Sequence, residues 1–309
     1  MLHKNLSILF SISVLSASLC LSACQKKNDD AEQPVSSPQL THVKNKPAPF
    51  EFTANLDNIP VQLPACEGKN CPEFQVQRLK TNYAFIDQQV DAAIIATLRN
   101  NLDLTTINPA ASDLVASEPQ TADLHQQVQQ YAKAFLALDQ ELKKINANPQ
   151  ISFHVQPKIL RKQENLVTVQ LNSDSFLGGA HGAAAQQYLT FDLKHKQQLY
   201  LNDILLPDHR NALLKQLHQQ FSQWVETQKL ADNLKDYEDA WPFKLSNNFY
   251  LSSQGLVLQY AEYEIGPYVV GMPSFTIPYS QLKGILKPEY LPKPDTTQAK
   301  TASPAQRST

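Results

Sequence analysis

The chain has 309 residues, a hydrophobic fraction of 42% and a formal net charge of −2 at pH 7. This length is sufficient for one large domain or two small ones. Because acidic and basic residues nearly balance and no long basic run occurs, the sequence lacks the electrostatic signature of a nucleic-acid-binding protein.

The N-terminal residues predict export across a membrane. His3 and Lys4 precede an apolar stretch over Leu6–Leu21 that ends in small residues. This stretch is too short and too polar for a membrane-spanning helix, and the order of its regions is typical of a signal peptide.

A lipid attachment site follows the apolar stretch. The sequence LSAC at Leu21–Cys24 resembles a bacterial lipobox, which implies a lipoprotein signal peptide over residues 1–23 and diacylation of Cys24. These acyl chains would anchor the protein stably to a membrane. Gln25 is not the aspartate that retains many lipoproteins in the inner membrane, so we expect an outer-membrane protein facing the periplasm. The alternative is an ordinary secretory signal with an accidental cysteine.

Cys66 and Cys71 are expected to form a disulfide. The compartment outside the inner membrane is oxidising, and the residues between the two cysteines include a glycine and an asparagine, which suit a turn. The spacing differs from that of a CxxC redox pair, and no further ligand residues lie nearby for zinc.

Polar, proline-containing segments flank the part that we expect to fold. Residues 24–49 are predicted to be a flexible tether between the lipid and the domain, and residues 291–309 a disordered tail. The folded part therefore extends from about residue 50 to residue 290.

Residues 50–148 are predicted to form a small N-terminal α+β subdomain. Strands are expected at Phe50–Leu63 and Phe74–Leu79, on either side of the disulfide turn, and apolar and polar residues alternate in the second, EFQVQRLK. Apolar residues recur every four positions from Ile86 to Leu98, and in steps of three and four from Leu124 to Ile145. Both spacings are typical of amphipathic helices.

Residues 149–290 are predicted to form a second α+β domain. A helix is expected over Leu213–Val225, and the SSQG turn before Leu256 predicts a hairpin in which Gly255 takes a positive φ. Strands are expected at Ile151–Leu160, Asn165–Asn172, Gln187–Leu193, Phe249–Leu251, Leu256–Tyr260 and Ser274–Ile277. Strands, helices and hairpins in this order predict an α+β fold with an antiparallel sheet, and no phosphate-loop pattern favours a doubly wound fold.

Three motifs in this second part carry a family resemblance. They are GGAHG, YLTFDLKHKQQLYLNDIL and NNFYLSSQGLVLQYAEYEIGPYVVGMPSFTIPYSQLKGIL. Over about Ile151–Leu286 the chain resembles the C-terminal domain of the RsiV-like family of extracytoplasmic proteins, and residues 50–145 resemble in pattern the smaller domain that often precedes it. The resemblance implies an RsiV ectodomain-like α+β fold and a non-catalytic binding domain whose partner is lysozyme or a related muramidase, or peptidoglycan.

The GGAHG loop holds the first group of candidate site residues. Gly178, Gly179 and Gly182 permit positive φ angles and close backbone approach, and His181 lies among them. One interpretation is a histidine that contacts a ligand or transfers a proton. The other is a tight turn whose histidine bonds a backbone carbonyl, which we favour because no orienting partner lies close in the sequence.

The segment YAEYEIGPYVVGMP holds the second group. Alternation places Tyr260, Glu262 and Glu264 on one strand face and Tyr263 on the other, after which Pro267 and Tyr268 turn the chain and display an aromatic ring. A tyrosine beside a proline suits a binding loop, because tyrosine adds contact area at low entropic cost. The alternative is an ordinary edge loop with tyrosines packed in the core.

Two alternatives to a binding protein remain open. The first is an envelope hydrolase that acts on cell-wall glycan or esters through His181 and a carboxylate such as Asp174 or Glu264. The second is a structural lipoprotein without a ligand. No metal or cofactor is expected, since His154 and His195 lack the spacing of metal ligands with His181.

Overall fold

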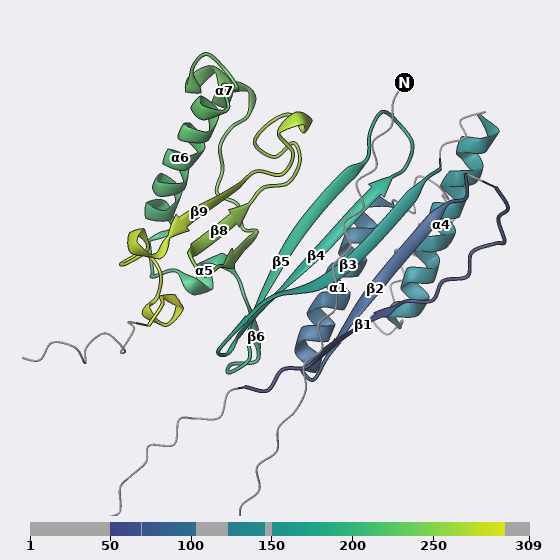
Figure 1. The fold of residues 1–309 in the computed structure, drawn as a ribbon, viewed down its shortest axis with the longest axis horizontal. Coiled ribbons are helices and arrows are strands. Elements are labelled where there is room, and N and C mark those ends of the chain that lie inside the picture. The colour runs from purple at the N-terminus through teal and green to yellow at the C-terminus, as the bar shows by residue number, and fades with distance from the viewer. Residues whose placement is uncertain (1–49, 69, 103–122, 146–149, 294–309) are drawn as a thin grey trace, which may run out of the picture. The chain divides into compact units, whose positions relative to one another are not determined.

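The structure, a computed structural model, describes residues 50–68, 70–102, 123–145 and 150–293 (Figure 1). The predicted signal peptide, the whole of the predicted tether with Cys24, and most of the predicted tail lie outside these residues. No helix within the described ranges combines the length and the apolar character needed to cross a membrane.

A six-stranded sheet forms the first part of the fold. Its strands follow one another in chain order, and all neighbours are antiparallel except β2 and β3, which are parallel. A parallel pair needs a long crossover, and the two helices α1 and α4 lie in it. The strands are β1 (Ala54–Asn58), β2 (Glu73–Thr81), β3 (Ser152–Gln163), β4 (Leu166–Phe176), β5 (Ala183–Asp192) and β6 (Gln197–Leu199).

The helices α1 (Ala84–Asn101) and α4 (Leu124–Lys144) pack on the sheet and on each other (Figure 1). The four apolar residues that predicted α1 are all buried: Ile86, Val90, Ile94 and Leu98. Burying such a side chain contributes about 1.5–3 kcal/mol. The Arg78 guanidinium on β2 also binds the Asp91 carboxylate on α1 through two hydrogen bonds, at 3.1 and 2.6 Å.

A three-stranded antiparallel sheet forms the second part, with strand order β7-β8-β9. Its own hydrophobic core includes four buried residues of the predicted helix: Leu213, Leu217, Phe221 and Val225. The elements are α5 (Leu201–Ile204), α6 (Arg210–Thr227), α7 (Leu234–Ala240), β7 (Phe249–Leu251), β8 (Gly255–Gln259) and β9 (Ser274–Pro278), with 3-10 turns at Tyr268–Val270, Tyr279–Gln281 and Pro288–Tyr290.

This arrangement confirms the predicted α+β class, with the parallel β2–β3 pair making the larger sheet mixed. That sheet runs across the boundary predicted between residues 148 and 149. Along the chain, the buried residues of the first hydrophobic core end at Leu193, and those of the second begin at Leu199. The division into domains at residues 50–148 and 149–290 stays a prediction.

Asn248 joins the two sheets. Its side-chain Nδ2 donates to Gln186 O at 2.7 Å, and its Oδ1 accepts from Tyr188 N at 2.8 Å. Since Gln186 and Tyr188 are alternate residues of β5, the amide of Asn248 bonds that strand as a neighbouring backbone would. The junction holds β7, which begins at the next residue, beside β5.

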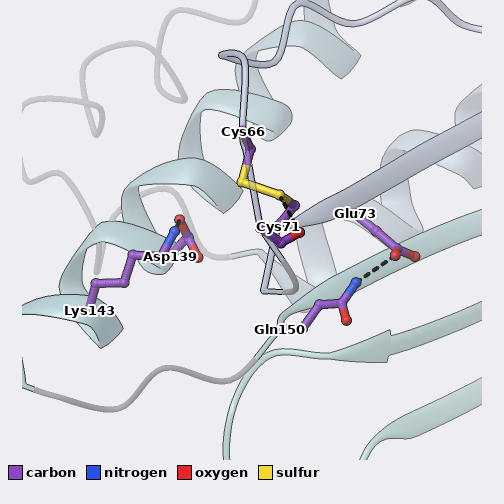
Figure 2. Close-up of a disulfide and its surroundings, with 7 residues drawn as sticks. Cys66, Cys71, Glu73, Asp139, Lys143 and Gln150 are labelled. Atoms are coloured by element: carbon purple, nitrogen blue, oxygen red, sulfur yellow. Dashed lines mark hydrogen bonds and ion pairs between the residues drawn. A yellow bond between two sulfur atoms is a disulfide. The ribbon is translucent and has the colours of Figure 1, made fainter.

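The disulfide between Cys66 and Cys71 is present, with a Cα–Cα distance of 5.7 Å that is usual for such bonds (Figure 2). It precedes β2, whose first residue Glu73 accepts a hydrogen bond from Gln150 Nε2 at 2.6 Å. Figure 2 shows the disulfide beside the part of α4 that carries the ion pair between Asp139 and Lys143.

Candidate binding site

The GGAHG loop joins β4 to β5. Gly178 and Gly179 have φ angles of 89° and 106°, as the sequence predicts. Gly182 has no positive φ, but a Cβ there would lie 2.9 Å from Ser175 O. Two glycines therefore allow the turn, and the third allows the two strands to approach closely as the ladder begins.

The second predicted loop follows β8, which ends at Gln259. The expected shared strand face for Glu262 and Glu264 is therefore wrong. The Glu264 carboxylate accepts from Ala261 N at 2.8 Å and lies 3.4 Å from Lys244 Nζ, so it closes its own turn. The Glu262 carboxylate accepts from Ala184 N at 3.3 Å and ties the loop to β5.

The two loops meet through three side chains, His181, Tyr263 and Tyr268, which we call the tyrosine–histidine cluster. The His181 ring stacks on the Tyr268 ring with centroids 3.9 Å apart and planes 18° apart. The Tyr268 hydroxyl donates to Gly182 O at 3.2 Å, and the Tyr263 hydroxyl lies 3.2 Å from His181 Nε2. Residues more than 80 positions apart thus form one surface.

The hydrogen bonds of His181 indicate which nitrogen of its imidazole ring carries the proton. Its Nδ1 lies 3.0 Å from Gly182 O, which can only accept, so Nδ1 carries a proton. In the neutral ring Nε2 then accepts from the Tyr263 hydroxyl. The ring is therefore held on both edges while one of its faces lies against Tyr268.

Tyr263 is the site residue that alternation missed. It has a φ of 62°, in the left-handed region that a bulky aromatic residue rarely adopts. This backbone conformation turns its side chain toward His181, away from the face that a strand would give it. Strained residues of this kind concentrate at functional sites. The surrounding sequence YEIGPY offers only the nearby glycine and proline as a signal of the turn.

The cluster continues into an exposed apolar surface. Tyr263 and Tyr268 are 50% and 36% exposed, and Val269 is 87% exposed on the 3-10 turn that follows Pro267. His181 is also exposed. Aromatic rings that are held in place but open to solvent suit the recognition of a macromolecule.

The carboxylates considered for a hydrolase are bound elsewhere. Asp174 accepts from His154 Nδ1 at 2.8 Å, across the β3–β4 ladder, and Glu264 is occupied by its own turn. Among the described residues, the hydrogen-bond partners of His181 are Gly182 O and Tyr263. Neither Asp174 nor Glu264 orients this histidine as a general base would require.

The other histidines belong to separate interactions. His195 Nδ1 binds the Asp192 carboxylate at 2.6 Å, at the turn between β5 and β6. Within the part of the chain that the structure describes, no three histidine, cysteine or acidic side chains converge as metal ligands.

A family model and two solved structures name the same domain family. Residues 202–280 match the model described as "Protein of unknown function (DUF3298)". From Bacillus subtilis (strain 168), peptidoglycan-N-acetylmuramic acid deacetylase PdaC is 26% identical over 221 residues, and anti-sigma-V factor RsiV is 30% identical over 138 residues. These regions cover 67% and 42% of the chain and 44% of each relative, so the chain spans less than half their length.

Two solved structures share the fold. A DUF3298 family protein from Pseudomonas aeruginosa PAO1 is 27% identical with a TM-score of 0.54, over 80% of this chain and 98% of that one. A member from Bacteroides fragilis NCTC 9343 is 20% identical with a TM-score of 0.50, over 77% and 93% of the two chains. Tyr263 and Tyr268 lie within the matched family region, whereas His181 precedes it.

Proposed function

The chain contains an RsiV-like DUF3298 domain, and we propose that it is a lipid-anchored protein of the bacterial cell envelope that uses this domain to bind a lysozyme-like muramidase. Cys24 carries the lipid in this proposal, and the protein faces the periplasm from the outer membrane. The domain binds its partner without catalysis, through the tyrosine–histidine cluster and Val269.

The observation that carries the proposal is the meeting of two loops in one exposed, ordered aromatic surface. Tyr268 is fixed by its hydrogen bond to Gly182 O and by the stacked ring of His181. A side chain that is already held in place loses little conformational entropy on binding. The next residue, Val269, is 87% exposed and adds an apolar surface that a partner could bury.

The relatives support the choice of partner. The chain is 30% identical to anti-sigma-V factor RsiV over 138 residues. The resemblance of the sequence motifs to the RsiV-like family implies lysozyme or a related muramidase as the partner. The similarity to PdaC, named for deacetylation of peptidoglycan N-acetylmuramic acid, favours peptidoglycan as a second candidate ligand. Both ligands belong to the same compartment, so the binding of each is measured.

The test measures binding of the chain from Gln25 onward to lysozyme by biolayer interferometry and to peptidoglycan by co-sedimentation. We expect Tyr268→Ala and Val269→Asp to weaken lysozyme binding by roughly 30-fold, the loss typical of a central interface residue. Tyr268→Phe keeps the stacked ring and should lose much less.

Tyr200→Ala is the matched control, because Tyr200 is 61% exposed but lies outside the cluster. Equal affinity of the wild-type chain and the Tyr268→Ala variant would rule out this surface. Retention on peptidoglycan alone would shift the function to glycan binding. A turnover of envelope glycans or esters that disappears in His181→Ala would instead support the hydrolase.

A further inference from the structure

A small cavity lies at the opposite end of β4 from the tyrosine–histidine cluster. It has a volume of about 140 Å³ and is lined by the turn between β3 and β4, the turn between β7 and β8, and the segment that ends at Lys293. Leu166, the first residue of β4, lines it. Since β4 has 11 residues, roughly 36 Å separate the two regions.

Two tyrosines line this cavity. The Tyr279 hydroxyl donates to Ser252 O at 2.9 Å, which fixes its ring. The Tyr290 hydroxyl has no hydrogen bond to a protein group among the described residues, and burial raises the pKa of Tyr290 to about 12. A half-buried hydroxyl of this kind is suited to bond with water or with a ligand in the cavity.

The charges of the lining balance. Lys293 forms an ion pair with Glu164 at 2.6 Å. Arg161 donates to the neutral amide oxygen of Gln163, and its remaining guanidinium protons have no acceptor among the described residues. Glu289 supplies a carboxylate to the same lining. The cavity therefore offers donors and acceptors together without a net charge that would select an ion.

This combination defines the chemistry of a ligand. Hydroxyl groups can accept from Arg161 and Tyr290 and donate to Glu289, while the apolar face of a ring packs on tyrosine. The volume is below the range of about 300–1,000 Å³ for drug-sized ligands, so only one small ring fits. We propose that this cavity binds a neutral, hydroxyl-rich ring of single-sugar size, either as a free sugar or as the end of a glycan.

The test titrates the full chain, in a detergent without sugar groups, with glucose and N-acetylglucosamine by ligand-observed NMR. We expect a Kd of about 1 mM, the order usual for a ligand of this size. Tyr290→Phe removes one hydroxyl and should weaken binding about fivefold, and Arg161→Gln about tenfold. Thermal unfolding of each variant verifies that it folds.

Lys162→Gln is the matched control, since Lys162 is an exposed cation that neighbours Arg161 on β3 and does not line the cavity. Weaker binding by Tyr290→Phe, with unchanged binding by Lys162→Gln, supports the site. The absence of binding, or equal binding by Tyr290→Phe and the wild-type chain, overturns it. Tighter binding of gluconate or of protonated glucosamine overturns the neutral class.

A linear tetramer of N-acetylglucosamine distinguishes the two sources of the ligand. Tighter binding of the tetramer than of the monomer, with the same sensitivity to Tyr290→Phe, identifies a glycan end. Equal or weaker binding of the tetramer identifies a free sugar. The outcome is independent of the proposed lysozyme binding, because Tyr268→Ala leaves this cavity unchanged.

Discussion

The side-chain amide of Asn248 forms the two hydrogen bonds to β5 that the backbone of a neighbouring strand would otherwise form. We expect Asn248→Ala to lower the free energy of unfolding by about 2 kcal/mol, because two backbone groups of β5 lose their partners at a half-buried position. Denaturant unfolding measures the change. Asn247→Ala is the control, since that side chain accepts only from Arg210 among the described residues. Equal losses in both variants would contradict the bridging role.

Single residues also separate what local sequence predicts from what it does not. The positive φ angles of Gly178 and Gly179 follow from a glycine-rich turn and are confirmed. The positive φ expected at Gly255 is wrong. A Cβ at that position would lie 2.0 Å from Ile277 O, so the glycine is required by the close approach of β9. A residue 22 positions away imposes this constraint, and no local pattern reports it.

Local sequence also predicts only part of the candidate site. Its two loops were identifiable separately, each from its own composition: Gly178, Gly179, His181 and Gly182 in one, and Pro267 and Tyr268 in the other. Their joining depends on Glu262 and Tyr263, whose contacts with β5 and His181 arise only when the second sheet packs beside the first. Alternation assigned Tyr263 to a strand that ends four residues earlier.

At the scale of elements, the turn between β5 and β6 depends on the buried carboxylate of Asp192. Burial alone would raise the pKa of Asp192. Hydrogen bonds from His195, Asn165 and the backbone N–H groups of Lys194 and His195 outweigh burial and hold the pKa below its usual value of 3.8. This carboxylate therefore stabilises the fold above that value, and its contribution is lost as the pH falls through the lower, folded-state pKa.

We expect Asp192→Asn to lower the free energy of unfolding by about 2 kcal/mol at neutral pH, since charge-assisted hydrogen bonds are replaced by neutral ones. The difference from the wild-type chain should shrink as the pH falls below about 4. Denaturant unfolding across that range measures it. Asp57→Asn is the control, because Asp57 is exposed and should show little change. A difference that stays constant with pH would contradict the assignment.

Element types were largely predictable because periodicity is local. The helices α1, α4 and α6 follow from apolar residues at helical spacing, and the buried side chains confirm the predicted faces of α1 and α6. In α4 the predicted face is buried from Leu124 to Phe135, whereas Ile145, which follows the last residue of the helix, is 72% exposed. The parallel pairing of β2 with β3 was not predictable in this way. Phe74 is paired with Phe153, and the helices α1 and α4 lie between them in the chain.

On the scale of the whole molecule, that pairing extends the larger sheet across the boundary predicted from the change in pattern between residues 148 and 149. The predicted boundary falls between α4, which ends at Lys144, and β3, which begins at Ser152. The first hydrophobic core continues past it to Leu193, and the second begins at Leu199. Patterns of strands and helices indicate where elements change, whereas cores depend on which elements pair.

The proposed lipid anchor also belongs to the whole molecule, because it would decide where the folded part works. We expect Cys24→Ser to move the protein from the membrane fraction to the soluble or unprocessed pool and to abolish incorporation of labelled palmitate, since acyl chains supply the membrane affinity. Cys20→Ser is the matched control, because Cys20 lies within the predicted signal peptide. Palmitate incorporation that persists in Cys24→Ser and disappears in Cys20→Ser would show that the lipid is attached to Cys20, and would refute the proposal for Cys24. Absence of label from the wild-type chain would refute the anchor while leaving the binding surface to its own test.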